Sequence, residues 1–293
     1  MDQVGGSSGM QVNAGQQAMA VVEGIASEVG LEVGDVVVLH DSNKLTVRLV
    51  PCDVVARVAP LGDQVAEFEV GLARGLEEVG CPVVGRLDAR GGRCVHERDG
   101  FVVTLWTYYE GAEAGREVSP DAYAGALRQL HGGLRQLDVA APHFTERVEA
   151  AQRLVADRGR TPELDDAGRE LLGDTLRTLR RYVEERGAAE QLLHGEPHPG
   201  NVLATADGPM FIDLETVCRG PVEFDLAHAP EEVGAYYPGV DAELLRVCRI
   251  LVPAIVTVWR WDREDRFPDG RRLGEEWLEQ VRAAVGDAQR LAE

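Results

Sequence analysis

Residues 192–201 constrain the fold of this chain more than any other stretch, and they read LLHGEPHPGN. The two prolines and two glycines prevent this stretch from forming a helix. Its histidines, carboxylate and amide are therefore expected on a loop, where polar groups carry function more often than core residues do. The loop leads into residues 201–215, NVLATADGPMFIDLE, in which Asp207-Gly208 marks a hairpin turn between two apolar strands.

The hairpin brings together residue types that bind divalent cations. Folding it at the predicted turn places Asn201, at its start, opposite Asp213, at its end. An amide oxygen and a carboxylate so placed can share a divalent cation. Glu196, five residues before Asn201, adds a second carboxylate. This order is the layout of a kinase catalytic centre, where the protein contributes positioning and charge neutralisation to phosphoryl transfer.

The first third of the chain has the pattern of a small antiparallel sheet with one main helix. Strands are expected at 40–51 and 53–60, each ended by a proline, and a helix is expected at 63–79 from its apolar spacing. Residues 93–111 follow a hairpin pattern with its turn at Asp99-Gly100.

The rest of the chain is mostly helical by period and composition. Helices are expected at 119–137, 143–157, 163–187, 241–259 and 274–292. These patterns predict an α+β fold with two lobes, a small sheet lobe and a larger helical lobe. The expected boundaries are a flexible tail at 1–16, an N-terminal lobe at 17–106 that opens with a helix at 17–29, a hinge at 107–111, and a helical C-terminal lobe at 112–293 that includes the loop 194–201 and the metal-binding hairpin 201–215.

HGEPHPGN followed by FIDLE resembles the motif pair of the aminoglycoside phosphotransferase and choline kinase-like family, in which H-G-D-x-x-x-x-N precedes I-D. The resemblance covers about residues 20–290. It implies a protein-kinase-like fold and an enzyme that moves the γ-phosphoryl of ATP or GTP, bound with Mg²⁺, to a hydroxyl of a small acceptor. The acceptor would be aminoglycoside-like or another small molecule. Acidic stretches of the helical lobe are a candidate lining for a cationic acceptor, or simply solvated surface; they are Glu231-Glu232, Asp241, Glu243, Asp262 to Asp265 and Glu275-Glu276.

The resemblance assigns nucleotide binding to the N-terminal lobe. Arg57 stands at the position of the ATP-phosphate lysine, and Glu69 on the next helix would be its ion-pair partner. Simpler interpretations are an ordinary strand arginine and an exposed helix acid. The remaining assigned residues are Ser42 and Asn43 in the turn over the phosphates, and Trp106, Thr107, Tyr108 and Tyr109 in the hinge beside adenine.

The resemblance assigns the chemistry to the loop and the hairpin. Glu196 would be the catalytic carboxylate and His194 would brace the loop. Asn201 and Asp213 would be the magnesium ligands. Asp225 and His198 would support the loop, and His131, His143 and His228 are expected to be surface or packing residues.

Two positions depart from the family pattern. Glu196 replaces an aspartate, and one methylene moves the carboxylate by about 1.5 Å, a displacement that can cost about 100-fold in rate. Arg57 replaces a lysine and lacks its point-charge geometry. Lys44, the single lysine, is close in sequence but out of register for that position. Three hypotheses stay open: an active phosphotransferase, a pseudokinase that binds nucleotide or metabolite, and a repurposed enzyme on this fold.

Composition and other motifs exclude several classes. The net charge of −20 disfavours a nucleic-acid partner. The sequence has no apolar run of about 18 residues and no signal-peptide pattern, so a cytoplasmic protein without membrane spans is expected. Five scattered cysteines predict reduced thiols. The prolines in the loop prevent the helix that a zincin motif requires, and neither a P-loop nor a Rossmann fingerprint occurs. The oligomeric state stays open.

Overall fold

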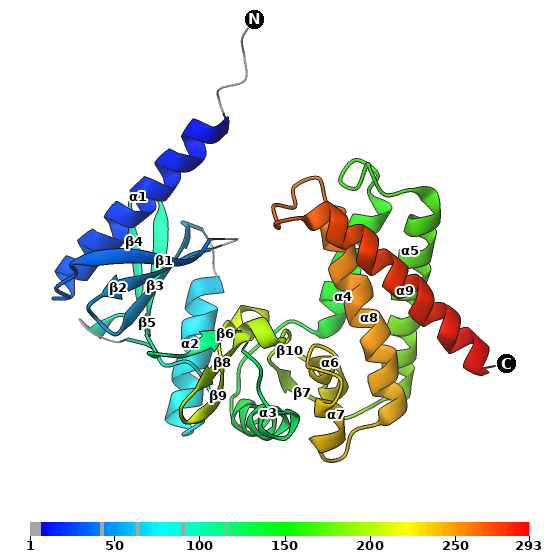
Figure 1. Ribbon diagram of the computed structural model, residues 1–293. Coiled ribbons are helices and arrows are strands. Elements are labelled where there is room, and N and C mark those ends of the chain that lie inside the picture. The colour runs from blue at the N-terminus through cyan, green and yellow to red at the C-terminus, as the bar shows by residue number, and fades with distance from the viewer. Residues whose placement is uncertain (1–6, 42–43, 63–64, 89–91, 115, 293) are drawn as a thin grey trace, which may run out of the picture. The chain divides into compact units, whose positions relative to one another are not determined.

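The structure is a computed structural model that describes residues 7–41, 44–62, 65–88, 92–114 and 116–292. The chain divides into two compact units (Figure 1). Unit 1 comprises Met1–Glu113 and Leu203–Glu215, and unit 2 comprises Ala114–Val202 and Thr216–Glu293.

Unit 1 is built on an antiparallel sheet with the strand order β1-β2-β3-β5-β4. Its strands are β1 Asp35–Asp41, β2 Leu45–Val50, β3 Val54–Pro60, β4 Val95–Arg98 and β5 Phe101–Thr107. Side chains alternate between the two faces of a strand. Ala56 and Val58 of β3 therefore join the buried cluster under the first helix, and Arg57 between them points to the opposite face.

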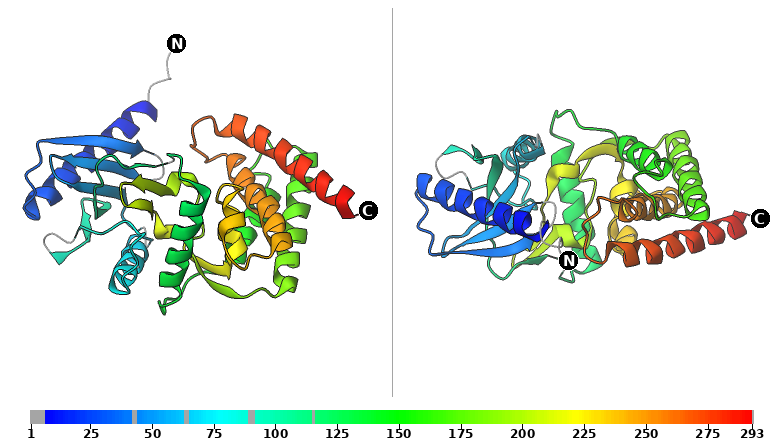
Figure 2. Two further views of the ribbon diagram at one scale, coloured as in Figure 1. Left: turned by 60° about the horizontal axis from the view of Figure 1, so that its bottom comes forward. Right: turned by 90° about the horizontal axis from the view of Figure 1, so that it is seen from above.

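The first helix, α1 Ser7–Glu28, packs along one face of this sheet (Figure 2). Its Val22 and Ile25 are buried against residues such as Val47 and Leu105. The helix begins at Ser7, so residues 7–16 are helical and not part of the expected tail. Helix elongation is cooperative, so a turn docked on the sheet extends readily into the Gln- and Ala-containing residues before it. The rest of the tail, 1–6, lies outside the described residues.

The start of the sheet differs from the expected single strand at 40–51. The structure has two strands there, β1 and β2, with Asp41 paired to Leu45. β1 is an edge strand, and its Val37, Val38 and Leu39 are 41%, 51% and 47% exposed. Its apolar run does not alternate with polar residues, so the period-2 pattern that identifies a half-buried strand is missing.

Both predicted hairpins are present. Asp99 and Gly100 have φ values of 48° and 84°, as a tight turn between β4 and β5 requires. The second hairpin consists of β8 Val202–Thr205 and β9 Gly208–Phe211, and β6 Glu113–Ala114 completes its sheet. Gly85 N donates to Phe211 O at 2.9 Å, and Phe211 N donates to Val83 O at 2.7 Å. These bonds place most of this hairpin in unit 1, although the sequence assigned it to the helical lobe.

Unit 1 also contains α2 Val65–Glu78, and unit 2 is mostly helical, as expected. The helices of unit 2 are α3 Pro120–Leu134, α4 Phe144–Ala156, α5 Asp166–Arg186, α6 Val222–Leu226, α7 Val233–Tyr236, α8 Ala242–Arg260 and α9 Gly270–Ala292. A strand pair, β7 Glu190–Leu193 with β10 Cys218–Pro221, lies beside them. Single 3₁₀ turns occur at Pro199–Asn201 and Leu214–Thr216. The core of unit 2 is apolar and includes Phe144, Phe224 and Leu251.

The predicted α+β class, with an antiparallel sheet in the first part and helices in the second, is confirmed. Among the helices in the described part of the chain, none combines the length and apolarity that a membrane-spanning segment needs.

Candidate active site

The second residue of the loop after β7 is a glycine that no other residue can replace without strain. Gly195 has a φ of 89°, and a Cβ on it would lie 1.9 Å from Thr216 O. Thr216 Oγ1 also donates to His194 O at 3.1 Å. His194 itself is fully buried and its Nδ1 accepts a hydrogen bond from Glu196 N at 3.3 Å. The backbone is therefore held closely at the point where it delivers Glu196.

Asp225, expected to support the loop, lies directly beneath it. Its two carboxylate oxygens accept hydrogen bonds from His194 N and Gly195 N, both at 2.8 Å. Burial raises the pKa of Asp225, but its hydrogen bonds and the nearby His131 and His194 lower it more, so the net pKa is lowered. The carboxylate therefore stays ionised although it is fully buried.

His131 was expected to be a surface or packing residue, and it is a fully buried packing residue that also hydrogen-bonds to Asp225. Its Nε2 lies 2.9 Å from Asp225 Oδ2 and its Nδ1 lies 2.7 Å from Tyr237 Oη. Because Asp225 is ionised, Nε2 is the donor in this contact, and Nδ1 is bonded to the tyrosine hydroxyl. His131 and Asp225 are 94 residues apart, so no local pattern indicates the contact.

Glu196, the expected catalytic carboxylate, forms an ion pair with Arg147 of α4. Arg147 Nη1 also donates to Gly195 O at 3.3 Å. Burial raises the pKa of Glu196, but the charge and the hydrogen bond of Arg147 outweigh it, so the pKa is lowered. The side chain remains 24% exposed. Glu196 is thus an ionised, partly accessible carboxylate, and its arginine partner was not foreseen from the sequence.

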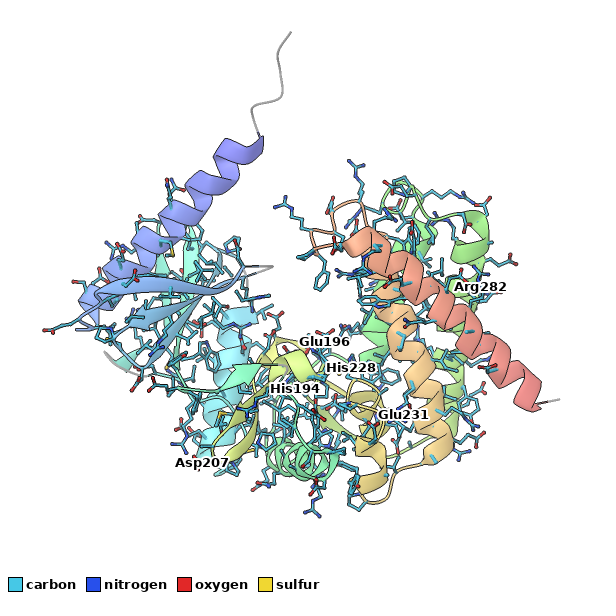
Figure 3. The ribbon with its side chains drawn as sticks, in the orientation of Figure 1. His194, Glu196, Asp207, His228, Glu231 and Arg282 are labelled. Carbon is cyan, nitrogen blue, oxygen red and sulfur yellow. The ribbon has the colours of Figure 1, made fainter. Side chains whose placement is uncertain are left out.

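His228 adds an imidazole to the same part of unit 2. Figure 3 shows it close to Glu196. Burial, together with the charge of Arg147, lowers the pKa of His228 to about 3, against the opposing effect of Glu196 and Asp225. The imidazole is neutral at physiological pH, and its buried Nε2 has no hydrogen-bond partner in the described part of the chain.

The end of the loop is a tight turn that presents Asn201. His198 Nδ1 accepts from Gly200 N at 3.0 Å, and Tyr123 Oη donates to Pro197 O. Asn201 Nδ2 donates to Glu196 O at 3.0 Å, which orients the amide plane. The carbonyl oxygen of that amide is the group expected to bind magnesium.

Unit 1 holds the other half of the predicted residues around one arginine. Arg57 Nη1 pairs with Glu69, which is 1% exposed, and Nη2 donates to Asp213 Oδ1 at 2.6 Å. Burial by itself lowers the pKa of Arg57, but the two carboxylates outweigh it and the net pKa is raised. Leu214 N also donates to Glu69 Oε1 at 3.2 Å. The expected pairing of Arg57 with Glu69 is therefore present.

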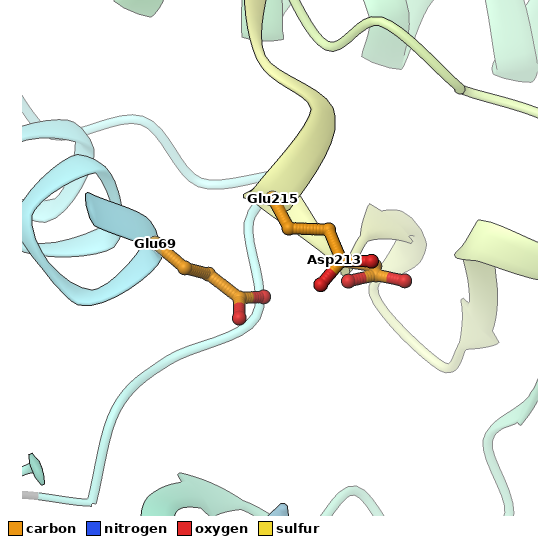
Figure 4. A group of neighbouring side chains, drawn as sticks. All are labelled: Glu69, Asp213 and Glu215. Atoms are coloured by element: carbon orange, nitrogen blue, oxygen red, sulfur yellow. The ribbon is translucent and has the colours of Figure 1, made fainter. Parts of the chain in front are cut away.

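Lys44 and Glu215 complete this cluster, and neither was among the predicted site residues. Lys44 Nζ pairs with Glu215 and lies 3.7 Å from Glu69 Oε2. Carboxylate oxygens of Glu69, Asp213 and Glu215 lie within 4.8 Å of one another (Figure 4). A donor set made of oxygens fits magnesium. Asp213 has a φ of 67°, a left-handed conformation that aspartate tolerates better than most residues.

Several polar groups of the predicted hinge residues already have hydrogen-bond partners within unit 1. Thr107 N donates to Arg86 O at 2.8 Å and Tyr108 N donates to Asp53 O at 3.0 Å. Tyr109 Oη accepts from Arg86 N at 3.1 Å. Any backbone bond to adenine must come from groups that these contacts do not use. Trp106 Nε1 is bonded to Thr104 Oγ1 at 2.9 Å, and the predicted residues Ser42 and Asn43 lie outside the described residues.

Comparison with known proteins identifies the class. The fold matches choline kinase LicA from Streptococcus pneumoniae, with a TM-score of 0.68, 17% identity, and coverage of 93% of this chain and 99% of that one. It also matches the GDP complex of aminoglycoside 2'-phosphotransferase-IIIa, with a TM-score of 0.68, 17% identity, and coverage of 91% and 98%. These likenesses define a protein-kinase-like fold.

The sequence gives the family. The model of the phosphotransferase enzyme family (APH) matches residues 36–264, so the chain belongs to that family. Methylthioribose kinase from Escherichia coli O45:K1 (strain S88 / ExPEC) is 33% identical over 161 residues. That match covers 50% of this chain and 38% of the relative's length.

Proposed function

We propose that this protein is a small-molecule phosphotransferase that moves the γ-phosphoryl group of a nucleoside triphosphate to an acceptor hydroxyl. The observation that carries the proposal is the loop 194–201, whose backbone is anchored on the buried Asp225 through His194 N and Gly195 N. The loop presents an ionised, partly accessible Glu196, and the amide of Asn201 donates to Glu196 O. Family membership and the named activities of the similar proteins support the same reaction class.

In the proposed reaction, the acceptor oxygen attacks the γ-phosphorus and the bond from that phosphorus to the β–γ bridging oxygen breaks. The nucleoside diphosphate leaves. Glu196 orients the attacking hydroxyl and accepts its proton. An ionised carboxylate with a lowered pKa suits the orienting role, because it accepts a hydrogen bond from the hydroxyl throughout the physiological pH range.

Magnesium, when bound, would neutralise the phosphate charge. Asp213 is the proposed ligand in unit 1, with Glu215 beside it, and the resemblance adds the amide oxygen of Asn201. Glu69 is committed to Arg57 and to Leu214 N, so it is proposed to position Arg57 and not to bind the ion.

The sequence left the acidic stretches of unit 2 as a candidate lining for a cationic acceptor. Their contacts in the structure do not support that use. Several of their carboxylates are paired within the unit: Asp241 with Arg186 at 2.6 Å, Asp262 with Arg160 at 2.6 Å and Asp265 with Arg260 at 3.1 Å. Arg147 beside Glu196 adds positive charge near the proposed chemistry. The proposed acceptor is therefore defined by its hydroxyl, and aminoglycoside-like molecules are one class to screen.

Thermal unfolding with and without magnesium plus ATP or GTP tests the proposal. A nucleotide at 100 times its dissociation constant should add about 2.7 kcal/mol to the free energy of unfolding. We expect a magnesium-dependent rise in melting temperature that disappears in Asp213→Ala. No shift with either nucleotide would contradict the proposal.

A second candidate is a nucleotide or metabolite binder with impaired catalysis. Arginines hold both carboxylates that the chemistry needs, Arg147 on Glu196 and Arg57 on Asp213. Turnover separates the two functions once the acceptor screen has been run. Detectable phosphoryl transfer that is lost in Glu196→Gln supports the phosphotransferase. Nucleotide binding without transfer, in both the parent and Glu196→Asp, supports the binder.

A further inference from the structure

The single lysine of this chain, Lys44, brings its ammonium group into the carboxylate cluster of unit 1. Lys44 immediately precedes β2, and its side chain is only 13% exposed. Its ammonium group pairs with Glu215 and lies 3.7 Å from Glu69 Oε2. Lys44 is out of register for the lysine position on β3. It nevertheless reaches the carboxylate cluster of unit 1 from the residue before β2.

Arg57, which stands at the expected lysine position, already forms ion pairs with two carboxylates. One terminal nitrogen pairs with Glu69 and the other with Asp213, so the planar fork joins β3 to α2 and to the segment after β9. A guanidinium suits this bidentate use, whereas an ammonium is a compact charge on a flexible stem and a common phosphate ligand. Turning Arg57 toward phosphate would break both ion pairs and leave the 1%-exposed Glu69 short of a partner.

The charges explain how Lys44 can be released. In the described part of the cluster, the carboxylates of Glu69, Asp213 and Glu215 face the cations of Lys44 and Arg57, which leaves one negative charge. A divalent cation beside Asp213 and Glu215 would supply the charge that Lys44 now supplies to Glu215. The ammonium group is then free to rotate toward a phosphate without leaving a carboxylate unpaired.

We propose that Lys44 is the residue that contacts the nucleotide phosphates, that Glu215 holds it in the nucleotide-free protein, and that Arg57 is a positioning residue. This inference rests on the proposed nucleotide-binding function and deepens it. In this proposal the phosphate-binding cation comes from the residue just before β2, and the arginine on β3 joins the carboxylates of the cluster.

Nucleotide affinity, measured by calorimetry with magnesium and ATP or GTP, is the first test. Loss of a charge-assisted contact should weaken binding about tenfold or more in Lys44→Met. Arg98→Met is the matched control, because it removes one cation from the same unit, where Arg98 pairs with the exposed Glu28 at 2.6 Å. We expect this control to bind like the parent. If the parent binds no nucleotide, the proposed function fails and this inference falls with it. If Lys44→Met binds as tightly as the parent, only the inference is overturned.

The Glu215→Gln background separates phosphate binding from mere neutralisation of Glu215. If Lys44 only balances that carboxylate, adding Lys44→Met to Glu215→Gln will leave nucleotide affinity unchanged, which would overturn the inference. If Lys44 contacts phosphate, the double variant will bind about tenfold more weakly than Glu215→Gln alone.

Covalent labelling gives a direct readout of the contact. In an ATP that carries an acyl group on its γ-phosphate, Lys44 Nζ attacks the acyl carbon, the bond from that carbon to the phosphate oxygen breaks, ATP leaves, and the nitrogen loses a proton to become an amide. Because Lys44 is the only lysine, mass spectrometry assigns the product without ambiguity. We expect labelling that excess magnesium–ATP suppresses. Labelling that ATP does not suppress, or none at all in a protein that binds ATP, contradicts the inference.

Discussion

At the scale of single residues, the glycine of the loop after β7 shows how one missing side chain sets the position of Glu196. Gly195 combines a left-handed φ with a close approach to the carbonyl of Thr216. This backbone conformation directs the two neighbouring side chains differently. His194 is buried, and Glu196 forms an ion pair with Arg147. In the sequence, this geometry corresponds to the single glycine that separates His194 from Glu196.

Gly195→Ala should therefore destabilise the protein by at least about 3 kcal/mol, because strain at the positive φ adds to the overlap with Thr216 O. Gly187→Ala is the matched control. Gly187 follows α5 with a φ of 61°, and apart from Gly187 itself and its two chain neighbours no atom of the described residues lies within 4 Å of the place that an added Cβ would take. Only the conformational cost of about 1 kcal/mol therefore applies. Urea unfolding measures both, and equal losses would show that the overlap has no effect.

At the scale of elements, a chain of buried polar groups joins three helices to the loop. Tyr237, which follows α7, contacts His131 of α3, and His131 contacts Asp225 of α6, which accepts from the loop backbone. Within this network, the side-chain polar atoms of Tyr237, His131 and Asp225 each have a hydrogen-bond partner. Removing one end leaves a buried nitrogen unsatisfied, which costs more than the bond itself contributes.

Tyr237→Phe should lower the free energy of unfolding by about 1–3 kcal/mol, because His131 Nδ1 loses its partner. The adjacent Tyr236 is 58% exposed, so Tyr236→Phe should change stability by less than about 0.5 kcal/mol. Thermal and urea unfolding of the pair decide the matter. A similar effect from both substitutions would mean that the hydroxyl of Tyr237 does not stabilise the network.

At the scale of the whole molecule, acid should weaken the fold through groups that are held in one protonation state. The folded pKa of His228, about 3, lies below its ordinary 6.5, so below pH 6.5 the unfolded chain binds a proton that the folded chain does not. Its contribution to stability is complete above pH 6.5 and is lost as the pH falls toward 3. The lowered pKa values of Glu196 and Asp225 act in the same direction, below the ordinary values of 4.5 and 3.8.

We therefore expect His228 to account for about 2 kcal/mol of the stability lost between pH 6.5 and pH 5, at about 1.4 kcal/mol per pH unit. His228→Gln should flatten the pH dependence of urea unfolding over that range. His40→Gln, at an exposed position of β1, is the control and should leave the slope unchanged. Parallel slopes for the parent and His228→Gln would contradict the assignment.

The sequence alone determined the features that depend on short separations along the chain. The turn at Asp99-Gly100, the hairpin after Asn201 and the periodic helices follow from local conformational preferences, and each is present. The spacing of Glu196, Asn201 and Asp213 was enough to suggest the family. The exposed edge strand β1 was missed because no buried face imposed a pattern on it.

Only the tertiary structure decided which side chains meet. Lys44 reaches Glu215 across 171 residues, Arg147 reaches Glu196 across 49, and His131 reaches Asp225 across 94. None of these pairs leaves a periodic or spacing signal, because a contact between distant segments depends on how whole elements pack and not on what lies nearby in the chain. The sequence thus indicated the kind of chemistry, and the packing decided which cations hold the carboxylates that would perform it.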